Sequence, residues 1–213
     1  MSEIVTVTIL YLTSFFTLIN PLGVMPVFMT MTSELTEQQR KKIAKKAVIV
    51  SFFTLIAFAF TGQLLFKFFG ISINSFRIVG GIIFLLVGFD MLQARLGKIK
   101  VSDNEIKKYS NDISITPLAI PMICGPGAIT NAIVLMDDSK TLIFKGILIA
   151  SIAIISIITY LILWSAAKIT NFLGETGNNV LMRLMGLIVM VIAIEFLFSG
   201  LKPILRDIFL ING

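Results

Sequence analysis

The length of the apolar runs is the feature that most constrains how this chain can fold. A helix needs roughly 20 residues to cross about 30 Å of hydrocarbon. Six apolar runs in this chain have about that length or more. Because 56% of the 213 residues are hydrophobic and only 14% are charged, lipid must cover much of their surface. We expect an all-α membrane protein with one multi-pass domain, residues 1–213, and six spans at 4–31, 47–66, 78–94, 113–136, 142–166 and 181–201.

Basic side chains concentrate in two connections between these runs. Residues 32–46 hold five Lys or Arg, and the polar connecting loop 95–112 holds five more. The positive-inside rule makes these connections cytoplasmic, so both termini are predicted on the outer side of a bacterial inner membrane. The basic residues that give the net charge of +6 orient the protein in the membrane, and no nucleic-acid binding is expected. The loop separates two halves, 1–94 and 113–201, and a short tail follows at 202–213.

The first of these connections carries its own helix signals. In "TSELTEQQRKKIAKKA", Ser33 or Thr36 can act as the N-cap. Acidic residues come early and basic residues late, which complements a helix dipole. We expect a capped amphipathic helix here.

The two halves carry similar features in the same order. "INPLGVMP" (19–26) resembles "ITPLAIPM" (115–122) through Pro21 and Pro117, and "RIVGGIIFLLVGFDML" (77–92) resembles "RLMGLIVMVIAIEFLF" (183–198). Because each half has three spans, the second half enters the membrane from the opposite side. We therefore expect two inverted three-helix repeats, a plan that many secondary transporters share.

Spans 1 and 4 contain residues that interrupt a helix, so we expect both to be broken. Proline removes a backbone donor and clashes one turn back, and glycine adds backbone freedom. The freed polar groups are tolerated in a bilayer only where protein or a water-filled cavity meets them. A packing kink would explain one such site, but two at corresponding places in a repeat favour a binding site in the protein interior.

A broken helix offers N–H groups to a carboxylate and carbonyl groups to an ammonium, so a pair of breaks suits a zwitterion. Neutral side chains add hydrogen bonds, and glycine lets the backbone approach a ligand closely. The predicted substrate-binding residues are Thr17 and Asn20 at the first break, and Thr116, Gly125, Gly127, Thr130 and Asn131 at the second.

Asp90 and Glu195 are the acids placed well inside apolar spans. Ionisable groups at such depth are usually paired or functional, and burial can raise the pKa of a carboxylate. They are the candidates for coupling to protons, although an interfacial ion pair with Arg95 explains Asp90 slightly better. With no histidine and one cysteine, Cys124, no catalytic, metal or cofactor site is expected, and the protein is not expected to be an enzyme.

"INPLGVMPVF", "PLAIPMICGPGAIT" and "GGIIFLLVGFDML" together resemble the MarC family of bacterial integral membrane proteins. The resemblance implies six spans in the cytoplasmic membrane. An archaeal relative is regarded as a transporter of small neutral amino acids such as glycine and alanine, and the family is distantly similar to LysE-type exporters. The resemblance carries over Asn20, Pro21 and Gly23 in the first motif and Pro117, Gly125, Pro126, Gly127 and Thr130 in the second.

The leading hypothesis is a secondary transporter that imports or exports small neutral amino acids or similar small metabolites. Its expected partners are the lipid bilayer, a small zwitterionic solute, and a proton or sodium ion for coupling. A homo-oligomer is left open. The alternatives are a non-transporting multi-pass protein that assists an envelope complex and a channel for small solutes.

Overall fold

The structure is a computed structural model that describes residues 2–32, 35–93 and 113–209. Over these residues every regular element is a helix. Five helical stretches are long and apolar enough to cross a membrane, and a sixth is added when the bent pair of η1 and α6 is counted as one span. The all-helical membrane fold is thereby confirmed. The elements are α1 (Ser2–Ile19), α2 (Pro21–Met31), α3 (Glu37–Phe69), α4 (Ile73–Leu92), η1 (Ser114–Ile123), α6 (Pro126–Asp138) and α7 (Leu142–Phe209).

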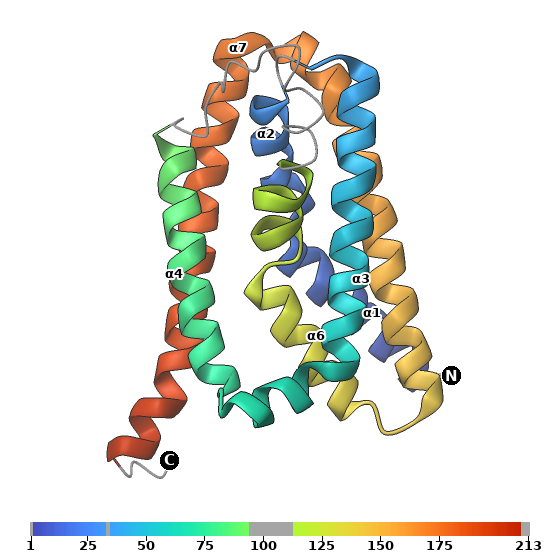
Figure 1. Cartoon of the computed structure of the whole chain (residues 1–213), viewed down its shortest axis with the longest axis vertical. Helices are drawn as coiled ribbons and strands as arrows, with labels where there is room; N and C mark the ends of the chain where they lie inside the picture. Colours follow the sequence, from blue (N-terminus) through green and yellow to red (C-terminus); the bar gives the residue numbers. More distant parts are fainter. Residues whose placement is uncertain (1, 33–34, 94–112, 210–213) are drawn as a thin grey trace.

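The two interrupted spans lie at the centre of the bundle (Figure 1). Helices α2, η1 and α6 run between two outer pairs, α4 with the C-terminal part of α7 and α3 with the N-terminal part of α7. Val27, Leu118 and Cys124 on these central segments are fully buried. The expectation that both breaks face the protein interior is therefore confirmed.

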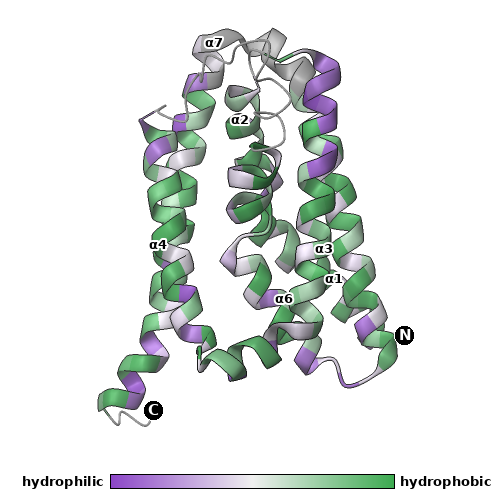
Figure 2. Ribbon diagram, viewed as in Figure 1, coloured by the Kyte–Doolittle hydropathy of each residue, from purple (hydrophilic) through white to green (hydrophobic). Residues whose placement is uncertain are grey.

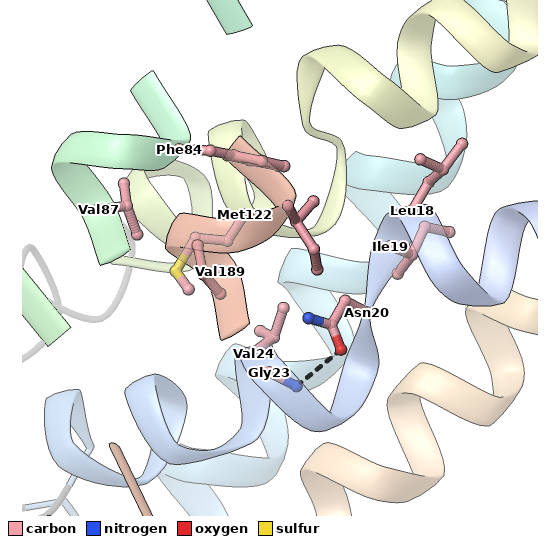
Figure 3. Close-up of a pocket in the computed structure, with 10 residues that line it drawn as sticks. Leu18, Ile19, Asn20, Gly23, Val24, Phe84, Val87, Met122 and Val189 are labelled. Atoms are coloured by element: carbon pink, nitrogen blue, oxygen red, sulfur yellow. Dashed lines mark hydrogen bonds between the residues drawn. The ribbon is translucent and has the colours of Figure 1, made fainter. Parts of the chain in front are cut away.

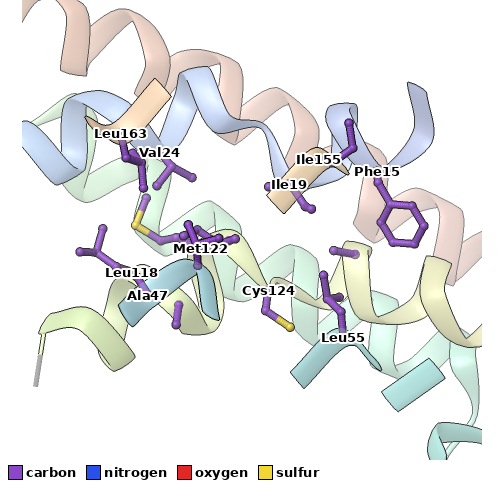
Figure 4. Packing of buried hydrophobic residues seen from close by; sticks show 14 of the residues in the cluster. Phe15, Ile19, Val24, Ala47, Leu55, Leu118, Met122, Cys124, Ile155 and Leu163 are labelled. Carbon is purple, nitrogen blue, oxygen red and sulfur yellow. The ribbon is translucent and has the colours of Figure 1, made fainter. Parts of the chain in front are cut away.

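Apolar side chains from α1, α3 and α7 pack against those of the central segments (Figure 4). Lipid tails are as apolar as these side chains, so close van der Waals packing, not the hydrophobic effect, holds the helices together within the bilayer. The residues that Figure 4 labels are Phe15 and Ile19 of α1, Val24 of α2, Ala47 and Leu55 of α3, Leu118 and Met122 of η1, Cys124, and Ile155 and Leu163 of α7.

The outer surface of the bundle is also apolar over most of its length (Figure 2). Phe53, Leu64, Leu86 and Val191 are each more than 60% exposed. Contiguous exposed apolar surface on this scale requires lipid or another protein to cover it. The outer faces of α3, α4 and α7 are the faces that a bilayer contacts.

Helix α3 is longer than the predicted span because the basic connection is its beginning. Thr36 is the N-cap, as predicted, and it forms a capping box with Gln39: the Thr36 N–H donates to Gln39 Oε1 over 2.8 Å, and the Gln39 N–H donates to Thr36 Oγ1 over 3.4 Å. Ser33, the other predicted cap, lies outside the described residues. The amphipathic segment is therefore continuous with the second span, and Gly70 ends the helix in a left-handed conformation.

Ser2 and Phe209 lie at the same end of the molecule as the turns at 70–72 and 139–141 (Figure 1). The basic start of α3 lies at the opposite end, where Figure 2 is most hydrophilic. This agrees with the predicted grouping of the connections, whereas the side of the membrane on which each end lies stays a prediction. The polar loop 95–112 lies outside the described residues.

Helix α7 joins the fifth and sixth predicted spans without a break in its helical structure. Its two apolar stretches, Leu142–Ala166 and Asn179–Phe209, run in opposite directions (Figure 1). The predicted tail at 202–213 continues the helix as far as Phe209. Lys202 and Arg206 are compatible with a helix that continues into the headgroup region, because long basic side chains extend toward water.

Candidate functional site

The first break consists of a single residue, Asn20, which separates α1 from α2. Asn20 adopts φ 46° and ψ 63°, the left-handed region that asparagine tolerates better than most residues. Pro21 follows at the first helical position, where its missing N–H costs nothing. The Asn20 carbonyl accepts from the N–H groups of Gly23 and Val24 over 2.9 and 3.1 Å, so α2 starts immediately after the break.

The Asn20 side chain is held over the start of α2. The Gly23 N–H donates to Oδ1 over 3.2 Å, and this bond fixes which end of the amide is oxygen. The Nδ2 group lies over Gly23, where a Cβ of that residue would meet it, and it forms no hydrogen bond with the described residues. A Cβ at Gly23 would lie 2.9 Å from Asn20 Cγ, so the amide can lie here only because residue 23 is glycine.

The second break extends over several residues. Within η1, Thr116 and Ile120 have extended backbone conformations, as expected for residues that precede proline. The Cys124 N–H donates five residues back to the Ala119 carbonyl over 2.7 Å, and Ser51 of α3 approaches the same carbonyl at 3.3 Å. A neighbouring helix thus satisfies part of the backbone that the prolines free.

Helix α6 starts after a bend of 57° relative to η1. Gly125 is its N-cap and contributes no side chain to the cap, and Pro126 occupies the first turn. The bend therefore falls at 124–125, within the predicted break region between Pro117 and Gly127. The backbone already leaves helical geometry at Thr116 and Ile120 within η1, and the change of direction is completed just before Pro126 starts α6.

A small internal cavity lies where the two breaks meet (Figure 3). About 30 Å³ is open to the centre of a water molecule, which is room for roughly two waters. Asn20 supplies the one polar side chain of its lining, and Met122 contributes from the residues just before the second break. The cavity is lined by Leu18, Ile19, Asn20, Gly23, Val24, Phe84, Val87, Met122, Val189 and Ile192.

Two phenylalanine rings cover the start of α6. Phe84 of α4 and Phe196 of α7 pack edge to face, with ring centroids 6.2 Å apart. A Cβ at Gly125 would overlap the Phe84 ring, and a Cβ at Gly127 would overlap the Phe196 ring. The glycines that we expected to let a ligand approach are instead in contact with aromatic side chains in this conformation, and Phe84 separates Gly125 from the cavity.

Polar contacts join α1 to α6 beside the breaks. Asn131 Nδ2 donates to Ser14 Oγ over 3.1 Å, and Tyr11 Oη lies 2.9 Å from Ser139 Oγ. Inter-helix hydrogen bonds such as these two are worth on the order of 1 kcal/mol in membranes, so they fix how the two interrupted spans lie against each other.

Thr130 of α6 is 2% exposed, and its Oγ1 has no hydrogen-bond partner among the described residues.

Residues 5–205 match the model of the family described as MarC family integral membrane protein. The chain belongs to the MarC family. A UPF0056 membrane protein of Pyrococcus horikoshii is 40% identical over 202 residues, covering 95% of this chain and 97% of the relative. The UPF0056 membrane protein YvbG of Bacillus subtilis is 38% identical over 192 residues, covering 89% and 91%. No solved structure matches the chain.

In this MarC-family protein the predicted site residues divide into three groups. Asn20 and Gly23 line the cavity. Pro21, Gly125, Pro126, Gly127 and Thr130 are buried, and Asn131 and Pro117 are half-buried, around the two breaks. Thr17 and Thr116 are exposed and do not line the cavity.

The coupling candidates also lie away from the cavity lining. Asp90 is half-buried on α4, and its predicted ion-pair partner Arg95 lies outside the described residues. Glu195 is exposed on α7, on the same face as the exposed side chains of Val191 and Phe198. Their role in coupling stays a prediction.

Sequence reasoning missed the apolar lining of the MarC-family cavity, above all Phe84, Met122 and Ile192. Apolar residues fill every span of such a chain, so nothing in their pattern separates a residue that lines a cavity from one that contacts lipid. Ser14 and Tyr11 carried a weak signal, because polar residues three apart on an apolar helix share one face.

Proposed function

We propose that this MarC-family protein is a secondary transporter of small neutral amino acids or similarly small zwitterionic metabolites in a bacterial cytoplasmic membrane. The observation that carries the proposal is the meeting of two interrupted spans at one internal cavity, in which the Asn20 amide is the polar side chain of the lining. Transporters commonly place their substrate at discontinuous helices near the midplane. We propose transport and not catalysis.

The chemistry of the breaks suits a zwitterion. A carboxylate can accept from Asn20 Nδ2 and from the N–H groups that open α6, where the helix dipole also favours negative charge. An ammonium group can donate to carbonyls that η1 leaves free of helical bonds. Hydrogen bonds to charged groups contribute about 1.5–3 kcal/mol each, so a few such contacts give the moderate affinity that a transporter requires.

The size of the cavity indicates which state the structure represents. A space of about 30 Å³ is smaller than glycine or alanine would need, so the site must enlarge for a solute to enter. Phe84 lies between the cavity and Gly125, and movement of its ring would join the cavity to the start of α6. We assign this conformation to a closed state between inward-open and outward-open forms.

The backbone supports an inverted repeat. Pro21 and Pro126 both open a helix directly after a break and are 105 residues apart; Arg77 and Arg183 are 106 apart. The two offsets agree closely, so we pair Pro21 with Pro126 in the repeat. The pairing of Pro21 with Pro117 that the sequence indicated has a smaller offset and does not fit them. The first three spans run in directions opposite to those of the last three (Figure 1).

The contact between α4 and the C-terminal part of α7 is also what such a repeat would produce. Gly200 lies beside Asn74, Gly81 beside Ala193 and Gly88 beside Gly186, so the helices are antiparallel. Two equivalent helices that cross in this way place a pseudo-two-fold axis in the membrane plane, between the halves. Relative movement of the halves about this contact is the proposed route to alternating access.

Flux measurements in proteoliposomes test the proposal. Labelled alanine and glycine should cross faster than in empty liposomes, with a rate that saturates, under a proton or a sodium gradient. The gradient that accelerates flux identifies the coupling ion. No flux above empty liposomes under either gradient would contradict the transporter, and flux without saturation would favour a channel.

A further inference from the structure

A second opening lies on the outer surface of the bundle, away from the cavity at the breaks. It is a groove of about 450 Å³ between α3 and the N-terminal part of α7. Its position on a lipid-facing surface, near the basic end of the molecule, indicates a ligand other than the transported solute. The groove is lined by Lys45, Val48, Ile49, Phe52, Ala153, Ser156, Ile157 and Tyr160.

The polar end of the groove presents a cation. Lys41, one turn before Lys45, is held by a 2.7 Å ion pair with Glu37 and lies 5.4 Å from the centre of the Trp164 ring. Lys45 forms no ion pair among the described residues. Tyr160 lies one turn from Trp164, and rings of these two types favour the headgroup level of a bilayer. A charged ammonium and a phenolic hydroxyl therefore meet the groove at that level.

The body of the groove is apolar. From Lys45 to Phe52 it extends about 10 Å along α3, at 1.5 Å per residue. Ile49 and Ile157 on its walls are 44% and 59% exposed, so their side chains require an apolar neighbour in the membrane. A hydrocarbon chain entering from the headgroup level matches this shape and polarity.

We propose that this groove is a binding site for one anionic phospholipid. Its phosphate would contact Lys45 Nζ and the Tyr160 hydroxyl, and an acyl chain would lie along Val48, Phe52 and Ala153. Basic pockets between spanning helices are a common form of anionic-lipid site. The proposal is independent of the transport function, since it uses none of the residues at the breaks.

Native mass spectrometry of the purified protein with dioleoyl phosphatidylglycerol or dioleoyl phosphatidylcholine tests the headgroup. The wild type should retain phosphatidylglycerol preferentially, and Lys45→Gln should weaken that binding about fivefold. Lys42→Gln is the matched control, because it removes the same charge at the same end without altering the groove lining. Equal retention of the two lipids, or equal losses in the two variants, would overturn the proposal.

A second pair of variants tests the acyl-chain path. Ala153→Phe fills the groove, whereas Ile154→Phe adds a ring on a neighbouring exposed position outside it. Ala153→Phe should lose phosphatidylglycerol binding at least fivefold, and Ile154→Phe should retain it. If Ala153→Phe instead dissociates a dimer of the chain without changing lipid retention, the groove is a contact between copies and the lipid assignment is wrong.

Discussion

Asn20 shows how one residue can both break a helix and serve a site. Its left-handed backbone conformation ends α1, and its carbonyl accepts the first hydrogen bonds of α2. Its side-chain oxygen accepts a hydrogen bond from the Gly23 N–H. The donor end of the amide is then left without a bond inside the described protein. The Asn-Pro pair could be recognised from sequence because both residues disfavour a continuing helix. The direction of the amide could not, since it depends on the contact with Gly23.

Gly23→Ala should move the Asn20 amide without unfolding the protein. The new Cβ would meet only the end of the Asn20 side chain, which can rotate away. Loss of one hydrogen bond to a charged solute predicts about a tenfold or greater fall in alanine affinity, measured by saturation of flux. Gly146→Ala is the control, because a Cβ there has nothing within 4 Å; transport should be unchanged. Wild-type affinity in Gly23→Ala would show that Asn20 does not bind the solute.

Gly127→Ala should lower thermal stability because its methyl group would overlap the Phe196 ring. Overpacking of this kind costs about 1–3 kcal/mol. In a Phe196→Ala background the same substitution should cost much less, and a double-mutant cycle on thermal unfolding measures the difference. Additive effects would mean that the Phe196 ring does not constrain Gly127.

The elements differ in how far local chemistry determines them. Proline and glycine predicted the breaks in spans 1 and 4. Capping chemistry predicted the N-cap at Thr36, and hydropathy predicted the approximate limits of the spans. The bend at 124–125 does not follow from sequence, because Pro117 and Pro121 are equally strong breakers and only packing decides among them. The continuity of α7 was also missed, since a polar connection between apolar spans gives no sign of whether its backbone stays helical.

Contacts between elements depend on small residues that sequence alone does not pair. A Cβ at Gly88 would lie 3.0 Å from the Gly186 carbonyl oxygen, and a Cβ at Gly186 would lie 2.8 Å from the Gly88 carbonyl oxygen. The two backbones are so close that a side chain at either glycine would overlap the backbone of the other helix. Small residues at such crossings let membrane helices approach closely.

Gly88→Leu should therefore separate α4 from α7. Backbone atoms cannot rotate away as a side chain can, so we expect destabilisation of about 3 kcal/mol or more and a lower midpoint of thermal unfolding. Gly146→Leu makes the same change at a helical position with open space and should leave the midpoint nearly unchanged. Similar midpoints for the two variants would contradict the close crossing.

The whole molecule combines two interrupted spans at its centre with an outer layer of helices that contact lipid. Hydropathy and charge predicted the helical class, the membrane location and the grouping of connections at the two ends. The location of the cavity required three-dimensional contacts, because its walls come from both broken spans, α4 and α7. The proposed transport cycle requires the break regions to become accessible to water and solute in turn.

The single cysteine of the chain provides the most direct measurement. Cys124 is fully buried at the second break, so a maleimide reacts only when that region opens. In proteoliposomes, labelling of the wild-type protein should be slow, and saturating alanine should slow it further because the bound solute covers the region around Cys124. A labelling rate that alanine leaves unchanged would contradict the claim that the solute binds where the two broken spans meet.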